Sequence, residues 1–122
     1  MNRTYQAYKL AAELVSDPTF GDYTLADAEI ERRKWDKNKV ASWGVGTVNY
    51  SEFRTRLKSA GYDAKFLDGI DLGRSNLFDN HNLIFTVYDD EGRPVGFSAR
   101  RLDDKGPKYT NTATTGLECA IF

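Results

Sequence analysis

The chain has 122 residues, 40% of them hydrophobic, and its 17 lysines and arginines against 18 aspartates and glutamates give a formal net charge of −1. This size and composition predict a single domain with its own hydrophobic core, and no apolar run approaches the roughly 20 residues that cross a bilayer, so we expect a cytoplasmic protein. The single cysteine, Cys119, excludes an internal disulfide and, with the lone His81, argues against a structural zinc site.

The first part of the chain, about residues 1–73, predicts a series of short helices. Apolar residues recur at helical spacing from Tyr5 to Val15, and Asp17-Pro18 should end this helix because proline disfavours a helical residue before it. Four further helices, including one over 37–43, are expected to follow side chains that accept from free N–H groups: Thr24, Asp36, Ser51 and Asp63. Three of these helices should end at a glycine: Gly44, Gly61 and Gly69.

The second part, about residues 83–112, predicts a β-hairpin followed by a basic loop. Strand-forming residues run from Leu83 to Tyr88 and from Val95 to Arg100, with the turn-like sequence Asp89-Asp90-Glu91-Gly92 between them. Alternation along the second strand should turn Phe97 towards the core and Arg100 away from it. The fold class expected is therefore α+β, with a mainly helical first half and an antiparallel hairpin, in one domain over 1–122.

Common catalytic and metal-binding patterns are missing from the sequence. Gly44-Val45-Gly46 is an incomplete dinucleotide fingerprint, and no phosphate-binding G-x-x-x-x-G-K-[ST] motif occurs. His81 stands beside turn residues without a neighbouring motif, which favours an exposed loop histidine. The clusters Asp89-Asp90-Glu91 and Asp103-Asp104 fit turns better than a cation site, so we predict no metal and no catalytic residue in this chain.

Positive charge is concentrated locally, although the net charge excludes a general polyanion binder. The stretch from residue 93 to 108 contains five basic residues and only two acidic ones, Asp103 and Asp104. The basic residues are Arg93, Arg100, Arg101, Lys105 and Lys108. The same stretch contains Pro107-Lys108-Tyr109-Thr110-Asn111, whose side chains suit phosphate contacts, base stacking and base-edge hydrogen bonds. Composition alone leaves two interpretations open, a nucleic-acid or nucleotide site and an ordinary solvated loop.

The order of these residues resembles the catalytic core of DnaG-type DNA primases. In that family a G-F-x-x-R strand, here Gly96 to Arg100, precedes a P-K-Y-x-N-[ST] segment, here Pro107 to Thr112. The strand over 83–88 and its acidic turn fit the same pattern, and the similarity continues more weakly back to Trp35. Two departures are Asn82, where family members commonly carry an arginine, and Thr86, which replaces a usual proline. Both suit a divergent phage or mobile-element primase.

The resemblance implies the part of the RNA-polymerising core that precedes a TOPRIM domain. In the family, acidic residues of the TOPRIM domain hold the catalytic metal, so Mg²⁺ is expected in that domain and no cofactor in this chain. The family's metal ligands would follow Phe122, and its zinc-binding module would precede this region. We therefore expect a fragment that is inactive alone, from a protein working in a bacterial cell or a phage-infected host.

The resemblance also implies site residues and partners. Arg100, Lys108, Tyr109 and Asn111 would line a basic groove for the single-stranded DNA template and the incoming ribonucleotides, with Arg93 and Arg101 as outer contacts or solvated side chains. The parent protein would synthesise RNA primers in replication, next to a TOPRIM domain and in contact with a replicative helicase. The alternative is a non-catalytic module, derived from a primase, that binds nucleic acid or another protein in a phage or mobile element.

Overall fold

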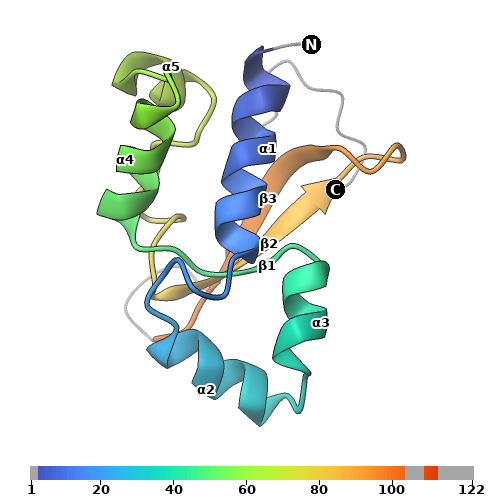
Figure 1. Ribbon diagram of the computed structural model, residues 1–122. Helices are drawn as coiled ribbons and strands as arrows, with labels where there is room; N and C mark the ends of the chain where they lie inside the picture. Colours follow the sequence, from blue (N-terminus) through green and yellow to red (C-terminus); the bar gives the residue numbers. More distant parts are fainter. Residues whose placement is uncertain (1–2, 104–108, 113–122) are drawn as a thin grey trace.

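The computed structural model describes residues 3–103 and 109–112, which form five helices and one four-stranded sheet (Figure 1). The helices are α1 (Arg3–Ser16), α2 (Thr24–Arg32), α3 (Lys37–Ser42), α4 (Tyr50–Ser59) and α5 (Ala64–Gly69). The strands are β1 (Val45–Gly46), β2 (Asn82–Tyr88), β3 (Pro94–Arg101) and β4 (Tyr109–Asn111). This arrangement confirms the α+β prediction. Within the described ranges, no helix has both the length and the apolarity needed to cross a membrane.

The sheet is antiparallel throughout and has the strand order β1-β2-β3-β4. The predicted hairpin is confirmed as β2 and β3, which pair from Asn82↔Arg101 to Tyr88↔Pro94 with an irregularity between Val87 and Tyr88. The two outer strands were not predicted. β1 has two residues and β4 has three, which is too short for a period-two pattern to be recognised. Part of the expected basic loop is therefore a strand.

One face of the sheet, which we call the inner face, is covered by α1 and α4. Phe97 and Ala99 of β3 and Ile84 of β2 are buried there in one cluster with Tyr8 of α1 and Phe53 of α4. The Tyr8 hydroxyl donates to the main-chain oxygen of Ile70 over 2.7 Å, so the polar end of this buried ring is satisfied. The predicted inward direction of Phe97 is confirmed.

The opposite, outer face is covered in part by α2 and α3. Ile30 of α2 and Val40 of α3 are buried with Val45 of β1 and Leu83 of β2 in a second, smaller cluster. Figure 1 shows α2 and α3 in the lower part of the view, away from α4 and α5 at the upper left. The two helices thus cover strands β1 and β2, and the outer side of β3 and β4 carries polar side chains instead.

Helix ends were predicted with mixed success. Asp36 and Asp63 are caps as predicted, because Asp36 Oδ1 accepts from the main-chain N–H of Asn38 at 2.8 Å and Asp63 Oδ1 accepts from Phe66 at 2.8 Å. The predictions for Thr24 and Ser51 were wrong. Thr24 is the first residue of α2 and donates its hydroxyl to Asp22, whereas α4 is capped by Asn49, which accepts from Glu52 N–H at 3.2 Å.

Glycine positions agree with the predicted helix ends. Gly44 and Gly61 follow α3 and α4 with φ of 75° and 102°, the left-handed region in which a side chain is strained. Gly69 is the last residue of α5. The turn at Gly44 leads α3 directly into β1, so that the third helix lies next to the edge of the sheet.

Candidate functional site

Four side chains of β3 and β4 form the polar part of the outer sheet face: Ser98, Arg100, Tyr109 and Asn111. The register places Ser98 opposite Asn111 and Arg100 opposite Tyr109, so the four lie on one side of the sheet. Their neighbours Phe97 and Ala99 are buried on the inner face, which fixes this orientation. We refer to these four residues as the β3–β4 face.

An aromatic ring and a guanidinium lie together on this face. The Tyr109 side chain is 58% exposed, and the Arg100 Cζ lies 5.9 Å from the centroid of its ring. This distance is at the outer limit of a cation–π contact. An exposed ring beside a positive charge is the combination that stacks on a base and contacts an adjacent phosphate.

Arg74 supports the β3–β4 face from the segment between α5 and β2. Its Nη1 donates to the main-chain oxygen of Asn111 over 2.8 Å. The sequence contained no signal for this residue, because its partner is 37 positions away and lies in a strand that was not predicted. Arg74 thus adds a second positive charge at the edge of the face.

Arg101 and Arg93 are held by carboxylates. Arg101 Nε lies 2.6 Å from Asp103 Oδ1, and this pairing raises the pKa of the guanidinium. Arg93 Nε lies 2.8 Å from Asp89 Oδ2, and the Arg93 pKa is raised in the same way. The carboxylate in each pair offsets the positive charge of the guanidinium, so a paired arginine attracts an external phosphate less strongly than an unpaired one.

The predicted site residues are therefore only partly brought together. Arg100, Tyr109 and Asn111 share one face, and Arg101 follows directly in the chain. Arg93 stands before the opposite end of β3, seven residues and about 23 Å from Arg100 along an extended strand. Lys108, the remaining predicted contact, lies outside the described residues.

Asn82 occupies the place where the family pattern commonly has an arginine, and its role is structural. The side chain is 2% exposed. Its Nδ2 donates to the main-chain oxygens of Asn76 and Leu77 at 3.0 and 2.8 Å, which holds the segment before β2 against the strand. This position contributes no positive charge to the outer face.

The remaining titratable groups do not form a metal centre within the described parts of the chain. No group of three or more histidine, cysteine, aspartate or glutamate side chains is found there. Asp89 accepts from the main-chain N–H groups of Glu91 and Arg93, each at 2.9 Å, and so closes the hairpin turn. His81 is an exposed loop residue, as predicted, with Nδ1 at 3.0 Å from Asp79 Oδ1.

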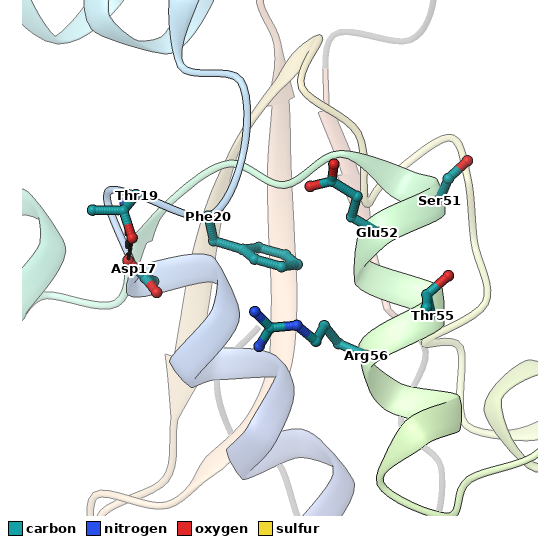
Figure 2. A pocket seen from close by; sticks show the side chains of 7 residues that line it. All are labelled: Asp17, Thr19, Phe20, Ser51, Glu52, Thr55 and Arg56. Atoms are coloured by element: carbon teal, nitrogen blue, oxygen red, sulfur yellow. Dashed lines mark hydrogen bonds between the residues drawn. The ribbon is translucent and has the colours of Figure 1, made fainter.

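A surface pocket of about 460 Å³ lies between the α1–α2 connection and α4 (Figure 2). Two of its polar lining residues, Asp17 and Thr19, are hydrogen-bonded to each other. Asp17 Oδ1 accepts from the Thr19 main chain at 2.9 Å and from its hydroxyl at 2.7 Å, and these bonds lower the pKa of Asp17. The Arg56 Cζ lies 5.2 Å from the Phe20 ring centroid. The pocket mixes both charges and belongs to different elements from the β3–β4 face.

Comparison with known proteins identifies one family. Residues 26–117 match the model of the DNA primase catalytic core, N-terminal domain. The DNA primase of Borreliella burgdorferi is 32% identical in an alignment 103 positions long, which covers 77% of this chain and 19% of that protein. The chain therefore spans about a fifth of the length of this curated relative.

Solved structures of primases share the fold. The RNA polymerase domain of Mycobacterium tuberculosis primase DnaG superimposes with a TM-score of 0.81 at 24% identity, over 96% of this chain and 41% of that one. The same domain in complex with double-stranded DNA superimposes with a TM-score of 0.78 at 25% identity, over 96% of this chain and 40% of that one. A DnaG primase catalytic domain bound to single-stranded DNA has a TM-score of 0.69 at 23% identity, over 98% of this chain and 40% of that one.

Proposed function

Because this chain belongs to the family of DNA primase catalytic core N-terminal domains, we propose that its β3–β4 face binds the single-stranded template on which a primase synthesises RNA primers. The single observation that carries the proposal is the exposed Tyr109 ring beside the Arg100 guanidinium, on the part of the sheet away from the cluster that α2 and α3 form with β1 and β2 in the described residues. Solved relatives in complex with single-stranded and double-stranded DNA support it.

Each side chain of the face has a distinct physical role in this proposal. Arg100 contacts a phosphate, which releases a condensed counterion. Tyr109 stacks on a base, an interaction that tolerates any sequence. Asn111 offers an amide to a base edge or to an incoming ribonucleotide, while its main-chain oxygen is held by Arg74. Lys108, adjacent to Tyr109 in the sequence, adds a further phosphate contact in the proposal.

The chemistry itself is assigned to another part of the enzyme. Nucleotidyl transfer needs a magnesium ion to neutralise charge on the triphosphate, and the described parts of this chain contain no cluster of three or more histidine, cysteine, aspartate or glutamate side chains suited to a metal ion. An adjoining TOPRIM domain would supply the ion, and this chain would hold the template in position. Positioning of this kind accounts for a large part of the barrier reduction in a two-substrate reaction.

Binding of a labelled single-stranded oligonucleotide, measured by fluorescence anisotropy over a range of salt concentrations, tests the proposal. Arg100→Ala should weaken binding and reduce the salt dependence by about one counterion. Tyr109→Ala should weaken binding by about 1–3 kcal/mol with the salt dependence nearly unchanged. Lys65→Ala is the matched control, because Lys65 is an exposed lysine of α5. Unchanged affinity in both test variants would reject the β3–β4 face as the binding site.

Arg93→Ala decides whether contacts extend along the whole of β3. If Arg93 is an outer contact, its removal lowers the salt dependence as Arg100→Ala does. If Arg93 serves only to pair with Asp89 in the hairpin turn, the affinity for the oligonucleotide is unchanged. Primer synthesis in the presence of the TOPRIM domain, Mg²⁺ and ribonucleotides is the second readout. There, Arg100→Ala should raise the KM for template.

A further inference from the structure

The two tryptophans of the chain flank α3, with Trp35 just before the Asp36 cap and Trp43 at the C-terminal end. Trp35, Lys39 and Trp43 are spaced four residues apart, and the main-chain N–H of Trp43 donates to the oxygen of Lys39 at 3.1 Å. Lys39 and Trp43 are therefore neighbours on the surface of α3, whereas Trp35 precedes the Asp36 cap of the helix. The two indole rings meet edge to face with centroids 6.3 Å apart. We call Trp35, Lys39 and Trp43 the tryptophan stripe.

The stripe ends in an exposed ring. Trp43 is 52% exposed, whereas Trp35 is half-buried and packs against the cluster between α2, α3 and the sheet. Val40 anchors the helix to that cluster. Trp43 is therefore not needed to fill the core, although a ring of its size is costly to leave in water. The Trp35 ring contacts the Trp43 ring, and about half of the Trp43 surface stays exposed.

The surroundings of the stripe are positively charged. Residues 32–43 carry five basic side chains and one acidic side chain, Asp36: the basic residues are Arg32, Arg33, Lys34, Lys37 and Lys39. Asp36 caps α3 with its carboxylate. The Arg33 Cζ lies 5.0 Å from the Trp35 ring centroid, which adds a cation to the aromatic pair.

The nearby carboxylates leave part of this charge uncompensated. Glu29 binds Arg32 and Arg33, and Asp27 lies 3.0 Å from Lys37. Lys34 and Lys39 are exposed and have no carboxylate within 4.0 Å among the described residues. Among the three acidic side chains of α2, Glu31 alone has no ion pair in the described structure, and its negative charge offsets part of the positive charge of Lys34 and Lys39. The uncompensated positive charge therefore lies beside the tryptophans.

Lys34 occupies a backbone position that favours glycine. Its φ is 58° and it follows the C-terminal end of α2, where a residue with a side chain is strained. A strained non-glycine residue is more readily explained when its side chain has a function. At this position the side chain supplies a cation next to Arg33 and Trp35.

The stripe is continuous with the sheet that carries the β3–β4 face. Trp43 precedes Val45 by two residues, and Val45 lies in one row across the sheet with Phe85, Ser98 and Asn111. Three strand spacings of about 4.8 Å separate the two ends of this row. Val45, two residues after Trp43, thus lies about 15 Å from Asn111 across the sheet, a separation that a strand of a few nucleotides can bridge.

We propose that the tryptophan stripe, together with Lys34, is a second contact for single-stranded nucleic acid, in which a base stacks on Trp43 and phosphates contact Lys34 and Lys39. The ligand class rests on the proposed function, since it is the same strand that the β3–β4 face binds. Stacking on an exposed aromatic ring beside flexible cations requires unpaired bases, so the surface should prefer single strands to duplexes.

Intrinsic fluorescence provides a direct test, because the chain has only two tryptophans and both belong to the stripe. Titration with an unlabelled oligothymidylate of about 20 nucleotides should quench the emission, with a smaller effect from a duplex of equal length. Trp43→Ala should weaken binding of the long oligonucleotide at least fivefold, and Trp43→Phe should retain most of the affinity. Lys39→Ala should lower the salt dependence by about one counterion, with Lys65→Ala as the control.

The outcomes separate this inference from the proposed function. If Arg100→Ala and Tyr109→Ala weaken binding while Trp43→Ala and Lys39→Ala do not, the stripe is excluded and the β3–β4 face stands. If the stripe variants alone weaken binding, the stripe stands and the β3–β4 face is excluded. Equal quenching by single strands and duplexes, or equal loss in Trp43→Phe and Trp43→Ala, would overturn stacking on Trp43. Thermal unfolding of each variant checks that the fold is retained.

Discussion

Arg74 and Asn111 join two segments that are 37 positions apart, through a 2.8 Å hydrogen bond from the guanidinium to the main-chain oxygen. β4 is a three-residue strand at the end of the strand order, and β3 is its one partner among the described strands. Immediately after it, the Thr112 Oγ1 accepts from Phe97 N–H at 3.0 Å. The position of Tyr109 and Asn111 on the outer face thus depends on a few bonds at one edge of the sheet.

Arg74→Ala should loosen β4 without unfolding the protein. The lost bond contributes about 1 kcal/mol, so main-chain amides of β4 should exchange with solvent about fivefold faster while those of β2 are unchanged. Hydrogen exchange followed by NMR measures both strands in one sample. Arg74→Lys keeps the positive charge but loses the planar guanidinium that donates to Asn111. Comparing Arg74→Lys with Arg74→Ala therefore separates the effect of the hydrogen bond from that of the charge. Equal protection of β4 in wild type and Arg74→Ala would show that β3 alone holds the strand.

Lys34→Gly should stabilise the protein by about 1 kcal/mol, because glycine adopts the φ of 58° at Lys34 without steric strain. Lys34→Ala removes the same charge but keeps the Cβ, so it should give no comparable gain. Urea denaturation of the two variants measures the difference. Similar midpoints for both variants would contradict backbone strain at this position. Both variants should bind single-stranded DNA more weakly if Lys34 contacts a phosphate.

Thr86→Val should be neutral or stabilising. The Thr86 hydroxyl is buried and has no hydrogen-bond partner among the described residues, and an unsatisfied buried polar group costs about 1–3 kcal/mol. Valine has nearly the same shape and suits a strand. Calorimetric melting of the variant should give an equal or higher Tm. A clear decrease would mean that the hydroxyl is satisfied in solution, for instance by a water molecule.

Thr86→Pro should destabilise the protein, although proline is the residue that the family pattern usually has here. The main-chain N–H of Thr86 donates to the Gly44 oxygen at 2.9 Å, and this bond connects β2 to the start of β1. Proline has no N–H to donate. The loss should be about 1 kcal/mol in urea denaturation. An unchanged midpoint would show that the bond is dispensable.

Acid should weaken the packing of α2 through Glu29. Hydrogen bonds from Arg32 and then Arg33 lower the pKa of Glu29 from 4.5 to about 2. Because the folded pKa is depressed, the stabilisation is fully present above pH 4.5 and is lost as the pH falls towards 2. Glu29→Gln should therefore lower stability at pH 7 by about 1 kcal/mol and lose less stability between pH 4.5 and 2. Denaturation midpoints across this range test it, and parallel curves for both proteins would contradict it.

Local features of the fold were predictable because their causes are local. The caps at Asp36 and Asp63 and the glycines after α3 and α4 act within one helical turn. The hairpin of β2 and β3 follows from two strand-forming runs around a tight turn. The errors at Thr24 and Ser51 have the same scale. Asp22 binds Thr24, and Asn49 starts α4 two residues before Ser51, which is within the usual spread of helix boundaries.

The candidate site was predictable in part. The order of residues in the motifs around Gly96-Phe97 and Tyr109-Thr110-Asn111 identified the family. Period-two alternation placed Arg100 on the outer face. Alternation could not show that Arg93 is paired with Asp89 at the other end of β3. Nor could it reveal the buried role of Asn82, whose partners are main-chain oxygens of a preceding turn.

The sequence by itself determined the family, the α+β class, most helix ends and the direction of the side chains in β3, since these depend on residue order and on contacts within a few positions. The tertiary structure decided that Tyr109–Asn111 is a strand, that Arg74 donates a hydrogen bond to it, and that the rings of Trp35 and Trp43 meet. Short strands and edge contacts gain their stability from partners far away in the chain. Their residues therefore carry no periodic signal that could be recognised before the sheet is assembled.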